Sequence, residues 1–191
     1  MKVVIVGGVA GGATAAARIR RLKEDAEIII LEKTGYISYA NCGLPYYIGD
    51  VIEESNNLIL QTPQSFKNRF CIDVRVNNEV ISVNSDKKYV VVKNVLTNET
   101  YQETYDKLIL SPGAKPLMPN ISGMDSNRIF TLKTVEDTFK MKKFIQDKNP
   151  KRVVIIGGGF IGMEMLENLL NLGLEAVSYT HLRAHETAAN L

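Results

Sequence analysis

The feature that most constrains the fold is a short apolar run followed by glycines, which occurs twice at a spacing of 150 residues. The first copy, residues 2–12, reads KVVIVGGVAGG, and the second, residues 152–162, reads RVVIIGGGFIG. Uninterrupted apolar strands are typical of parallel sheets that are covered on both faces. A strand that runs through glycines into a helix is how a nucleotide-binding βαβ unit begins. The sequence therefore predicts an α/β fold with two such units.

The first glycine turn departs from the usual phosphate-binding motif at one position. Phosphates approach backbone N–H groups at a helix N-terminus, and side chains would block that approach. The second turn carries all three motif glycines, but in the first turn Val9 stands between Gly7 and Gly12 at the third position. Glu32 supports the first turn, because it follows the expected strand 27–31, where a carboxylate accepts both ribose hydroxyls of an adenosine. We therefore expect a dinucleotide at each turn.

The segments between the two copies predict further helices and strands. Helices are expected at 42–49, from Thr62 to Arg69, and from the capping-box pair Thr134 and Asp137 to about Gln146. Three β-rich stretches, 72–76, 80–83 and 89–95, predict a small antiparallel excursion, and 107–110 returns to an apolar strand. Residues 148–150 are expected to form a linker, and Gly173 suits the end of the last helix.

Composition excludes several classes of protein. The 191 residues carry 23 Lys and Arg against 21 Asp and Glu, so a net charge of +2 favours neither nucleic acid nor an anionic membrane as partner. Apolar runs reach only about five residues, far short of a membrane span. The two cysteines are too far apart for metal-ligand spacing, so we expect no metal. The first residues lack the layout of a signal peptide, which indicates a soluble cytoplasmic protein.

The last fifteen residues differ from the rest of the chain. From Val177 the sequence reads VSYTHLRAHET and contains both histidines, His181 and His185. This string matches the translation of a transposase-type DNA sequencing adapter, and the alternative is a natural polar tail. Segments of foreign origin are left out of fold reasoning. We therefore take residues 177–191 as an adapter-derived tail and residues 1–176 as the protein.

The segment after the first βαβ unit makes a resemblance to a known family specific. Residues 38–47 read SYANCGLPYY, and residues 105–114 read YDKLILSPGA. Together with the two glycine turns and Glu32, these motifs resemble the FAD-dependent pyridine nucleotide–disulfide oxidoreductases. They are most similar to the single-cysteine branch of coenzyme A disulfide reductases and NADH oxidases. The resemblance covers residues 2 to about 176, and members of the branch are much longer, so we expect only their N-terminal part here.

The resemblance implies that Cys42 lies beside the flavin ring and acts as the redox thiol. Relatives with two redox cysteines place the second one five residues later, where this chain has Tyr47. Cys71 lies where a strand is expected, and we take it as an inert thiol. A lone redox cysteine forms a mixed disulfide with a small thiol or stops at sulfenic acid. A helix that begins at Cys42 would favour its thiolate; an inert buried thiol is the alternative.

The helix after the first turn offers a face for the substrate. Thr14, Arg18 and Arg21 follow at i, i+4 and i+7, so they share one face. Guanidinium groups bind phosphate in a forked geometry. The resemblance implies that this face, with Ser38 and Asn41, binds the coenzyme A half of the substrate. A solvated basic face is the alternative.

A peroxide-reducing branch of the family carries a histidine where this chain has Ala10. Residues 1–176 contain no histidine, so a general acid for cleavage of the peroxide O–O bond is missing from that place. Disulfide reduction is therefore favoured over peroxidase chemistry, whereas oxidase activity stays open.

The resemblance implies a Rossmann-like FAD-binding domain over 1–148, which lacks its C-terminal segment, and the truncated start of a second Rossmann-like domain for NAD(P) over 149–176. The cofactor-binding residues that it implies are Gly7, Gly8, Ala10, Gly11, Gly12, Glu32, Lys33, Val80, Ser111, Gly113, Ala114, Lys133, Gly157, Gly159 and Gly162.

The activity implied by the resemblance is a transfer of electrons from NAD(P)H through FAD to Cys42. The substrate would be coenzyme A disulfide or a related small disulfide or persulfide, and the full-length protein would be a homodimer. We expect the chain as given to be inactive, because the remaining parts of such an enzyme are missing. An NADH oxidase that uses a Cys42 sulfenic acid and a non-catalytic FAD-binding module are the alternatives.

Overall fold

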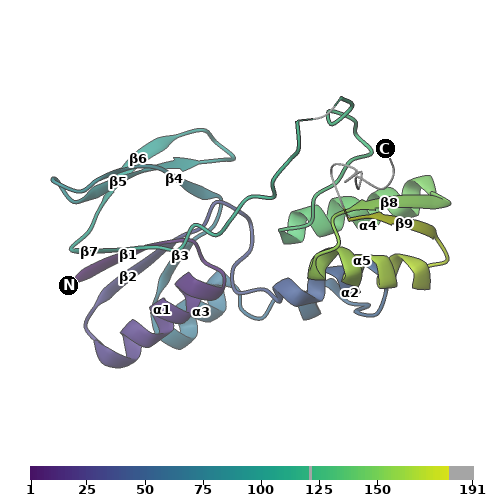
Figure 1. Ribbon diagram of the computed structural model, residues 1–191. Helices are drawn as coiled ribbons and strands as arrows, with labels where there is room; N and C mark the ends of the chain where they lie inside the picture. Colours follow the sequence, from purple (N-terminus) through teal and green to yellow (C-terminus); the bar gives the residue numbers. More distant parts are fainter. Residues whose placement is uncertain (121, 181–191) are drawn as a thin grey trace, which may run out of the picture. The chain divides into compact units, whose positions relative to one another are not determined.

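The computed structural model describes residues 1–120 and 122–180. Within them the chain forms two compact units, one made of residues 1–40 and 59–115, the other of residues 41–58 and those from 116 onward. Figure 1 labels the helices and strands of both units. The units divide the chain differently from the expected domains 1–148 and 149–176. The segment 41–58 and helix α4 (Val135–Lys148) belong to the second unit, because they pack with its helix and strands.

The first unit is built on a four-stranded parallel sheet. Its strands are β1 (Lys2–Val6), β2 (Glu27–Leu31), β3 (Asp73–Arg75) and β7 (Lys107–Leu110), in the order β3-β2-β1-β7. The central strands β1 and β2 are apolar and almost wholly buried, since both faces of the sheet are covered. The expectation of a parallel sheet built on two apolar strands is confirmed.

Three layers make up this unit (Figure 1). On one face lie helices α1 (Ala10–Leu22) and α3 (Pro63–Phe70), whose Ala13, Ala16 and Phe66 pack on Val3 and Ile5. On the other face lies a three-stranded antiparallel sheet of β4 (Asn78–Asn84), β5 (Tyr89–Asn94) and β6 (Thr100–Thr104). Val90 and Val92 of β5 pack on Val4 and Ile29. Alternate residues of β1 therefore serve two different cores.

The expected antiparallel excursion exists, but the first of its three stretches was assigned wrongly. Residues 73–75 form β3, which pairs in parallel with β2 in the main sheet. Helix α3 precedes β3, and a strand–helix–strand crossover returns the chain parallel to where it left. The strand pattern of 72–76 alone carries no information about its neighbour in the sheet.

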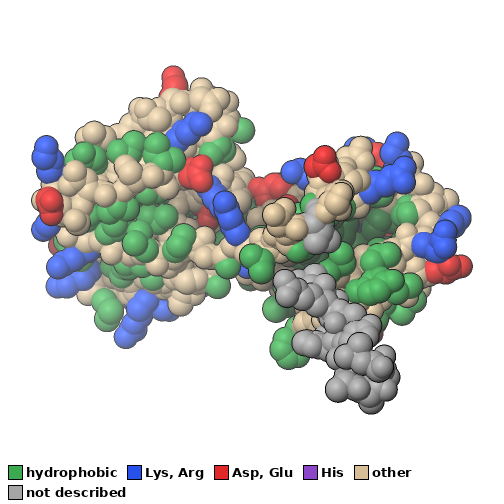
Figure 2. Space-filling model, turned by 45° about the horizontal axis from the view of Figure 1, so that its top comes forward, with side chains coloured by type: hydrophobic (Ala, Val, Ile, Leu, Met, Phe, Trp, Pro, Cys, Tyr) green, Lys and Arg blue, Asp and Glu red, His purple; other side chains and the backbone are tan. Residues whose placement is uncertain are grey.

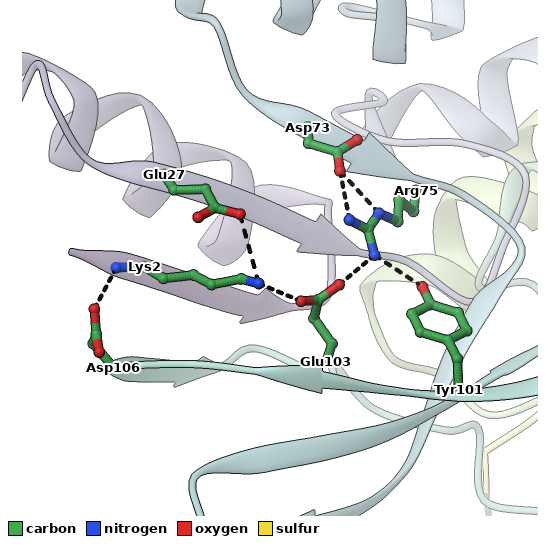
Figure 3. A network of polar contacts seen from close by, with 7 residues as sticks. All are labelled: Lys2, Glu27, Asp73, Arg75, Tyr101, Glu103 and Asp106. Carbon is green, nitrogen blue, oxygen red and sulfur yellow. Dashed lines mark hydrogen bonds and ion pairs between the residues drawn. The ribbon is translucent and has the colours of Figure 1, made fainter.

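A network of charged side chains joins the two sheets (Figure 3). Glu103 of β6 is only 9% exposed and accepts hydrogen bonds from Lys2 of β1 and Arg75 of β3. Arg75 also pairs with Asp73 (2.8 Å) and donates to the hydroxyl of Tyr101 (3.3 Å). The network therefore ties the antiparallel sheet to two strands of the parallel sheet.

The second unit packs helix α5 on one face of a two-stranded sheet, and two further helices join the same core. The strands β8 (Arg152–Ile156) and β9 (Glu175–Tyr179) are parallel and enclose helix α5 (Phe160–Asn171) in the sequence. Helix α2 (Leu44–Ile48), flanked by the 3₁₀ turns η1 (Asn41–Gly43) and η2 (Ser55–Leu58), joins this unit together with α4. The core is formed by Ile48, Met165, Leu169 and Leu174.

Strand β9 extends beyond the expected end of the folded sequence. The expectation placed that end at residue 176, whereas Val177, Ser178 and Tyr179 continue the strand and pair with β8. Residues 181–191 of the predicted tail, including His181 and His185, lie outside the described residues. The pairing concerns the backbone and does not decide the origin of these residues.

The helix expected at 42–49 is shorter, because Pro45 interrupts its start. In an α-helix that began at Cys42, the carbonyl of the preceding Asn41 would accept the first hydrogen bond, from the N–H of residue 45. Residue 45 is a proline, which has no N–H. Residues 41–43 accordingly form a 3₁₀ turn, and α2 begins at Leu44. Cys42 lies in that turn and not at the first position of an α-helix.

One face of the β8–β9 sheet is exposed. Val154, Ile156, Val177 and Tyr179 are each 53–58% exposed, whereas Val153 and Ile155 on the other face pack on the core. Apolar side chains reach the surface of both units, as Figure 2 shows in green.

Candidate functional site

The first glycine turn holds helix α1 very close to strand β1. Gly7 has a φ of +94°, and a Cβ there would lie 2.0 Å from the carbonyl oxygen of Ser111. A Cβ on Gly12 would lie 1.7 Å from the carbonyl oxygen of Gly7. No side chain fits at either place, so these two glycines are required by the backbone itself.

The second turn repeats this geometry. Gly157 has a φ of +113°, and a Cβ on Gly162 would lie 2.1 Å from the carbonyl oxygen of Gly157. The N–H of Gly157 donates to the carbonyl of Tyr179 over 2.8 Å, and the N–H of Gly7 donates to the carbonyl of Leu31 over the same distance. The two copies of the sequence motif therefore fold into the same strand–turn–helix.

At the third position of the glycine motif, Val9 in the first turn and Gly159 in the second, the surrounding protein leaves room for a side chain. Around Gly159 nothing lies within 4 Å of an added Cβ, and the equivalent Val9 has a φ of −95°. The valine therefore leaves the turn intact. Its side chain matters only for a ligand that approaches the turn.

The helix N-termini at both turns suit an anion. Neither α1 nor α5 has a side chain that caps its first turn, and neither has an acidic residue there. The first N–H groups of each helix are therefore available, and the helix dipole favours negative charge. Glycine neighbours keep the approach to α1 open, which fits a pyrophosphate.

Glu32 is held in place by three donors. It is 6% exposed and follows β2 directly. Its Oε2 accepts from the N–H of Gly8 (2.8 Å), and its Oε1 accepts from the N–H and the hydroxyl of Thr34 (2.9 Å each). Two carboxylate oxygens offer about four acceptor positions, so one position remains for a further donor. The expected bond to two ribose hydroxyls requires one of these contacts to be shared or released.

The remaining predicted flavin residues divide between the two units. In the first unit Ser111 lies against Gly7 and Gly11, Gly113 has a φ of +72°, and Ala114 and Lys33 are exposed. Val80 lies on β4, which begins where the N–H of Asn78 donates to the carbonyl of Glu32. The structure therefore brings the glycine turn, Glu32 and Ser111 together. Lys133 belongs to the second unit, directly before α4.

The side chains on the basic face of α1, formed by Thr14, Arg18 and Arg21, are exposed. Neither arginine side chain makes a hydrogen bond or ion pair within the described part of the chain. Arg20 differs, because its guanidinium donates to the carbonyls of Phe70 (2.7 Å) and Cys71 (3.0 Å) at the end of α3. The chain thus separates a structural arginine from two that are available to a ligand.

Ser38 and Asn41 lie in different units. Ser38 has a φ of +43°, and its N–H donates to the carbonyl of Gly8, so it adjoins the first glycine turn. Asn41 is exposed in η1 of the second unit.

Cys42 is an exposed thiol in η1, so the alternative of a buried inert thiol does not apply to it. At the place of a second redox cysteine, Tyr47 packs edge-on against Phe139, with ring centres 5.7 Å apart. Lys142 lies over the tyrosine ring, with its Nζ 3.8 Å from the ring centre.

The expectation that Cys71 lies in a strand is wrong. Cys71 caps the end of α3 in a left-handed conformation, with a φ of +50°, and its thiol is exposed. Its backbone serves the α3 terminus through the N–H bond to Lys67 and the bond from Arg20.

Sequence reasoning missed Thr34 and Lys142. Thr34 follows the acidic residue at a spacing of two, a pattern in which a hydroxyl often bonds a nearby side chain or backbone group, so the sequence held a signal. Lys142 looks like any exposed lysine of a helix, and the sequence held none.

The described residues contain neither a metal-binding cluster nor a helix able to span a membrane. Among residues 1–120 and 122–180, no three Cys, His, Asp or Glu side chains are grouped to hold a metal ion. In the same ranges every helix is too short or too polar to cross a bilayer.

Comparison with known proteins gives consistent matches. A family model described as pyridine nucleotide-disulphide oxidoreductase matches residues 1–188. The coenzyme A disulfide reductase of Staphylococcus haemolyticus (strain JCSC1435) is 47% identical over 174 residues, which make up 91% of this chain and 39% of that protein.

Two solved structures are also similar. Reduced Bacillus anthracis CoADR-RHD is 54% identical with a TM-score of 0.91, over 93% of this chain and 32% of the other. The water-forming NADH oxidase from Lactobacillus brevis, bound to NADH, is 30% identical with a TM-score of 0.85, over 93% of this chain and 39% of the other. The chain therefore spans well under half the length of the proteins it matches.

Proposed function

The chain belongs to the pyridine nucleotide-disulphide oxidoreductases, an FAD-binding family whose members use NADH or NADPH, and on this premise we propose that it carries the flavin site and the redox thiol of a coenzyme A disulfide reductase. The observation that carries the proposal is the exposed thiol of Cys42 in a segment whose fifth following residue is a packed tyrosine. Such a thiol has no local partner and must react with a small molecule.

The first unit would hold the ADP part of FAD. The N–H groups at the start of α1 would bind the pyrophosphate, and the remaining acceptor position of Glu32 would bind the ribose. Lys33, Val80, Ser111, Gly113, Ala114 and Lys133 are the further contacts that we propose. FAD would supply the electron pair, taken from NAD(P)H, that reduces the disulfide. The turn from Gly157 to Gly162 would bind the nicotinamide cofactor.

Cys42 would react directly with the substrate. Its thiolate would attack one sulfur of coenzyme A disulfide, forming a Cys42–coenzyme A mixed disulfide and releasing one coenzyme A thiolate. Arg18 and Arg21 have no ion pair within residues 1–120 and 122–180, and such positive charge suits the phosphates of coenzyme A. Thr14, Ser38 and Asn41 complete the proposed substrate site.

A second candidate is an NADH oxidase that cycles Cys42 through a sulfenic acid. The similarity to the Lactobacillus brevis oxidase favours it, because that enzyme is 30% identical over the same residues. The absence of a second cysteine at Tyr47 is compatible with either chemistry.

The chain as given would be a non-catalytic flavin-binding part of a longer, homodimeric protein located in the cytoplasm. The matched residues cover 39% of the Staphylococcus haemolyticus reductase, which supports the part of this proposal that concerns a longer protein. We also propose that residues 177–191 derive from a sequencing adapter. Resequencing the gene would then show a different continuation after residue 176, and an intact reading frame encoding His181 and His185 would refute the proposal.

The 191-residue chain should not oxidise NAD(P)H with coenzyme A disulfide at an ordinary enzyme rate, on the order of 10 per second.

Trapping the Cys42 adduct tests the function. The full-length gene product is expressed, and Cys42 is examined by peptide mass spectrometry before and after reduction with NADH. A coenzyme A adduct that disappears on reduction is expected, and Cys42→Ser should abolish turnover. A dimedone-reactive sulfenic acid would favour the oxidase. A Cys42 that carries neither species and a variant that keeps its turnover would overturn both.

A further inference from the structure

Helix α2 depends on its neighbours for its position. It has five residues, and isolated helices shorter than about 12 residues are marginal in water. Leu44 and Ile48 are buried, and Ile48 belongs to a core shared with α5. Because Cys42 lies two residues before α2, whatever fixes this helix also fixes the backbone that carries the thiol.

A partly buried cation holds the C-terminal end of α2. The side chain of Lys142 on α4 is only 12% exposed, and its Nζ lies 2.7 Å from Asp50 Oδ1. The same Nζ donates to the carbonyl of Tyr47 over 2.7 Å and lies over the tyrosine ring. All of these partners belong to α2 or to the turn that follows it. A buried ammonium is costly unless it is paired, so the contacts fix Lys142 and α2 to each other.

The chemistry of this contact is that of a helix cap supplied from another helix. The last carbonyls of a helix lack partners within it, and a positive charge there also complements the helix dipole. Helix α5 also packs closely against the end of α2, because a Cβ on Gly49 would lie 2.3 Å from Asn168 Oδ1 of α5. The end of α2 is therefore enclosed by α4 and α5.

We propose that Lys142 is a positioning residue for Cys42. It anchors the far end of α2 and thereby sets the 3₁₀ turn in which the thiol is presented. Lys142 is not among the residues of the proposed catalytic or binding site, and it acts through the backbone of residues 43–47. The proposal rests on the proposed role of Cys42 as the redox thiol.

The chain offers a matched control for this residue. Lys143 is next in α4, but its side chain is 75% exposed and pairs with Asp147 within the same helix. Lys142→Met removes the charge and keeps the aliphatic stem, Lys142→Arg keeps the charge, and Lys143→Met removes an equal charge that holds nothing outside α4. Cys71, an exposed thiol of the other unit, serves as an internal reference in every variant.

The experiment measures thiol–disulfide exchange with coenzyme A disulfide as the probe. The reduced 191-residue chain is mixed with the probe between pH 6 and 9, and mass spectrometry follows the adducts on Cys42 and Cys71 separately. Lys142→Met is expected to slow exchange at Cys42 about tenfold, because a displaced nucleophile loses orientation, and to leave Cys71 unchanged. Lys142→Arg should recover most of the rate, and Lys143→Met should behave like the parent chain.

The outcomes separate this proposal from the one on which it rests. If Cys42 of the parent chain forms no adduct, both proposals fail. If the parent reacts but Lys142→Met reacts equally fast, only the positioning role is refuted. Equal slowing at both cysteines, with a lowered melting temperature, would show a general loss of stability and would also refute it.

Discussion

Gly11 and Gly12 are neighbours in the first turn of α1, yet the space around them differs sharply. An added Cβ on Gly12 would overlap the carbonyl of Gly7, whereas one on Gly11 would lie 3.1 Å from the hydroxyl of Ser111, a side chain that can turn away. We predict that Gly12→Ala lowers the free energy of unfolding by roughly 2–3 kcal/mol, because helix and strand must separate. Gly11→Ala should change it by less than about 1 kcal/mol. Urea denaturation of both variants checks this; equal effects would contradict it.

Individual site residues could be predicted wherever a local rule governs them. Gly7 and Gly12 follow from the tight turn, and Glu32 follows from its place after the second strand. Thr62 and Thr134 cap their helices as the sequence indicates. Lys142 could not be found in this way, because its hydrogen-bond partner Tyr47 lies 95 residues away in the chain.

The sequence predicted whether a segment is a helix or a strand better than it predicted which strands pair in a sheet. The glycine turns indicate α1 and α5, the capping residues Thr62 and Thr134 indicate α3 and α4, and the strand expected at 27–31 is present. The sequence pattern did not show that β3 joins the parallel sheet, since partner choice depends on the crossover and not on the strand's own residues. It also extended α2 over Cys42, although the missing N–H of Pro45 prevents an α-helix from starting there.

The strands β1, β3 and β6 meet at Glu103, and this contact should make stability depend on pH. Burial raises the pKa of the Glu103 carboxyl, but hydrogen bonds from Lys2 and Arg75 outweigh burial and hold the pKa below its usual value of 4.5. A carboxyl with a lowered pKa in the folded state contributes stability that is present above the unfolded value and is lost as pH falls through the folded one. The contribution should thus be present at pH 7 and fade below about pH 4.5.

Glu103→Gln tests this contribution. The variant should melt at a lower temperature at pH 7, by an amount equivalent to on the order of 1 kcal/mol, and should differ less from the parent at pH 3.5. Glu79→Gln, on β4, is the control, because the side chain of Glu79 makes no hydrogen bond or ion pair within the described residues. A difference between Glu103→Gln and the parent that is the same at both pH values would refute the assignment.

At the scale of the whole molecule, the exposed face of the β8–β9 sheet should govern self-association. Val154 and Ile156 lie exposed on one face of a sheet that has two strands within the described residues, beside Val177 and Tyr179 of the proposed adapter-derived tail. Exposed apolar surfaces of this kind promote association. We predict that the chain forms concentration-dependent oligomers in light scattering, and that the double variant Val154→Lys, Ile156→Lys reduces them without lowering the melting temperature. Val153→Lys, on the packed face, should lower the melting temperature. Unchanged association in the double variant would contradict this.

The interleaving of the two units has a consequence for biosynthesis. The segment with Cys42 leaves the ribosome early, but its anchor Lys142 follows Tyr47 by 95 residues. At a usual elongation rate of 5–20 residues per second, the nascent α2 waits roughly 5–20 s before its cap exists. During that interval Cys42, the proposed redox thiol, lies in peptide that lacks its anchor from α4, so oxidants and low-molecular-weight thiols can reach it. Protection of this cysteine is therefore a matter of translation speed as well as of the finished fold.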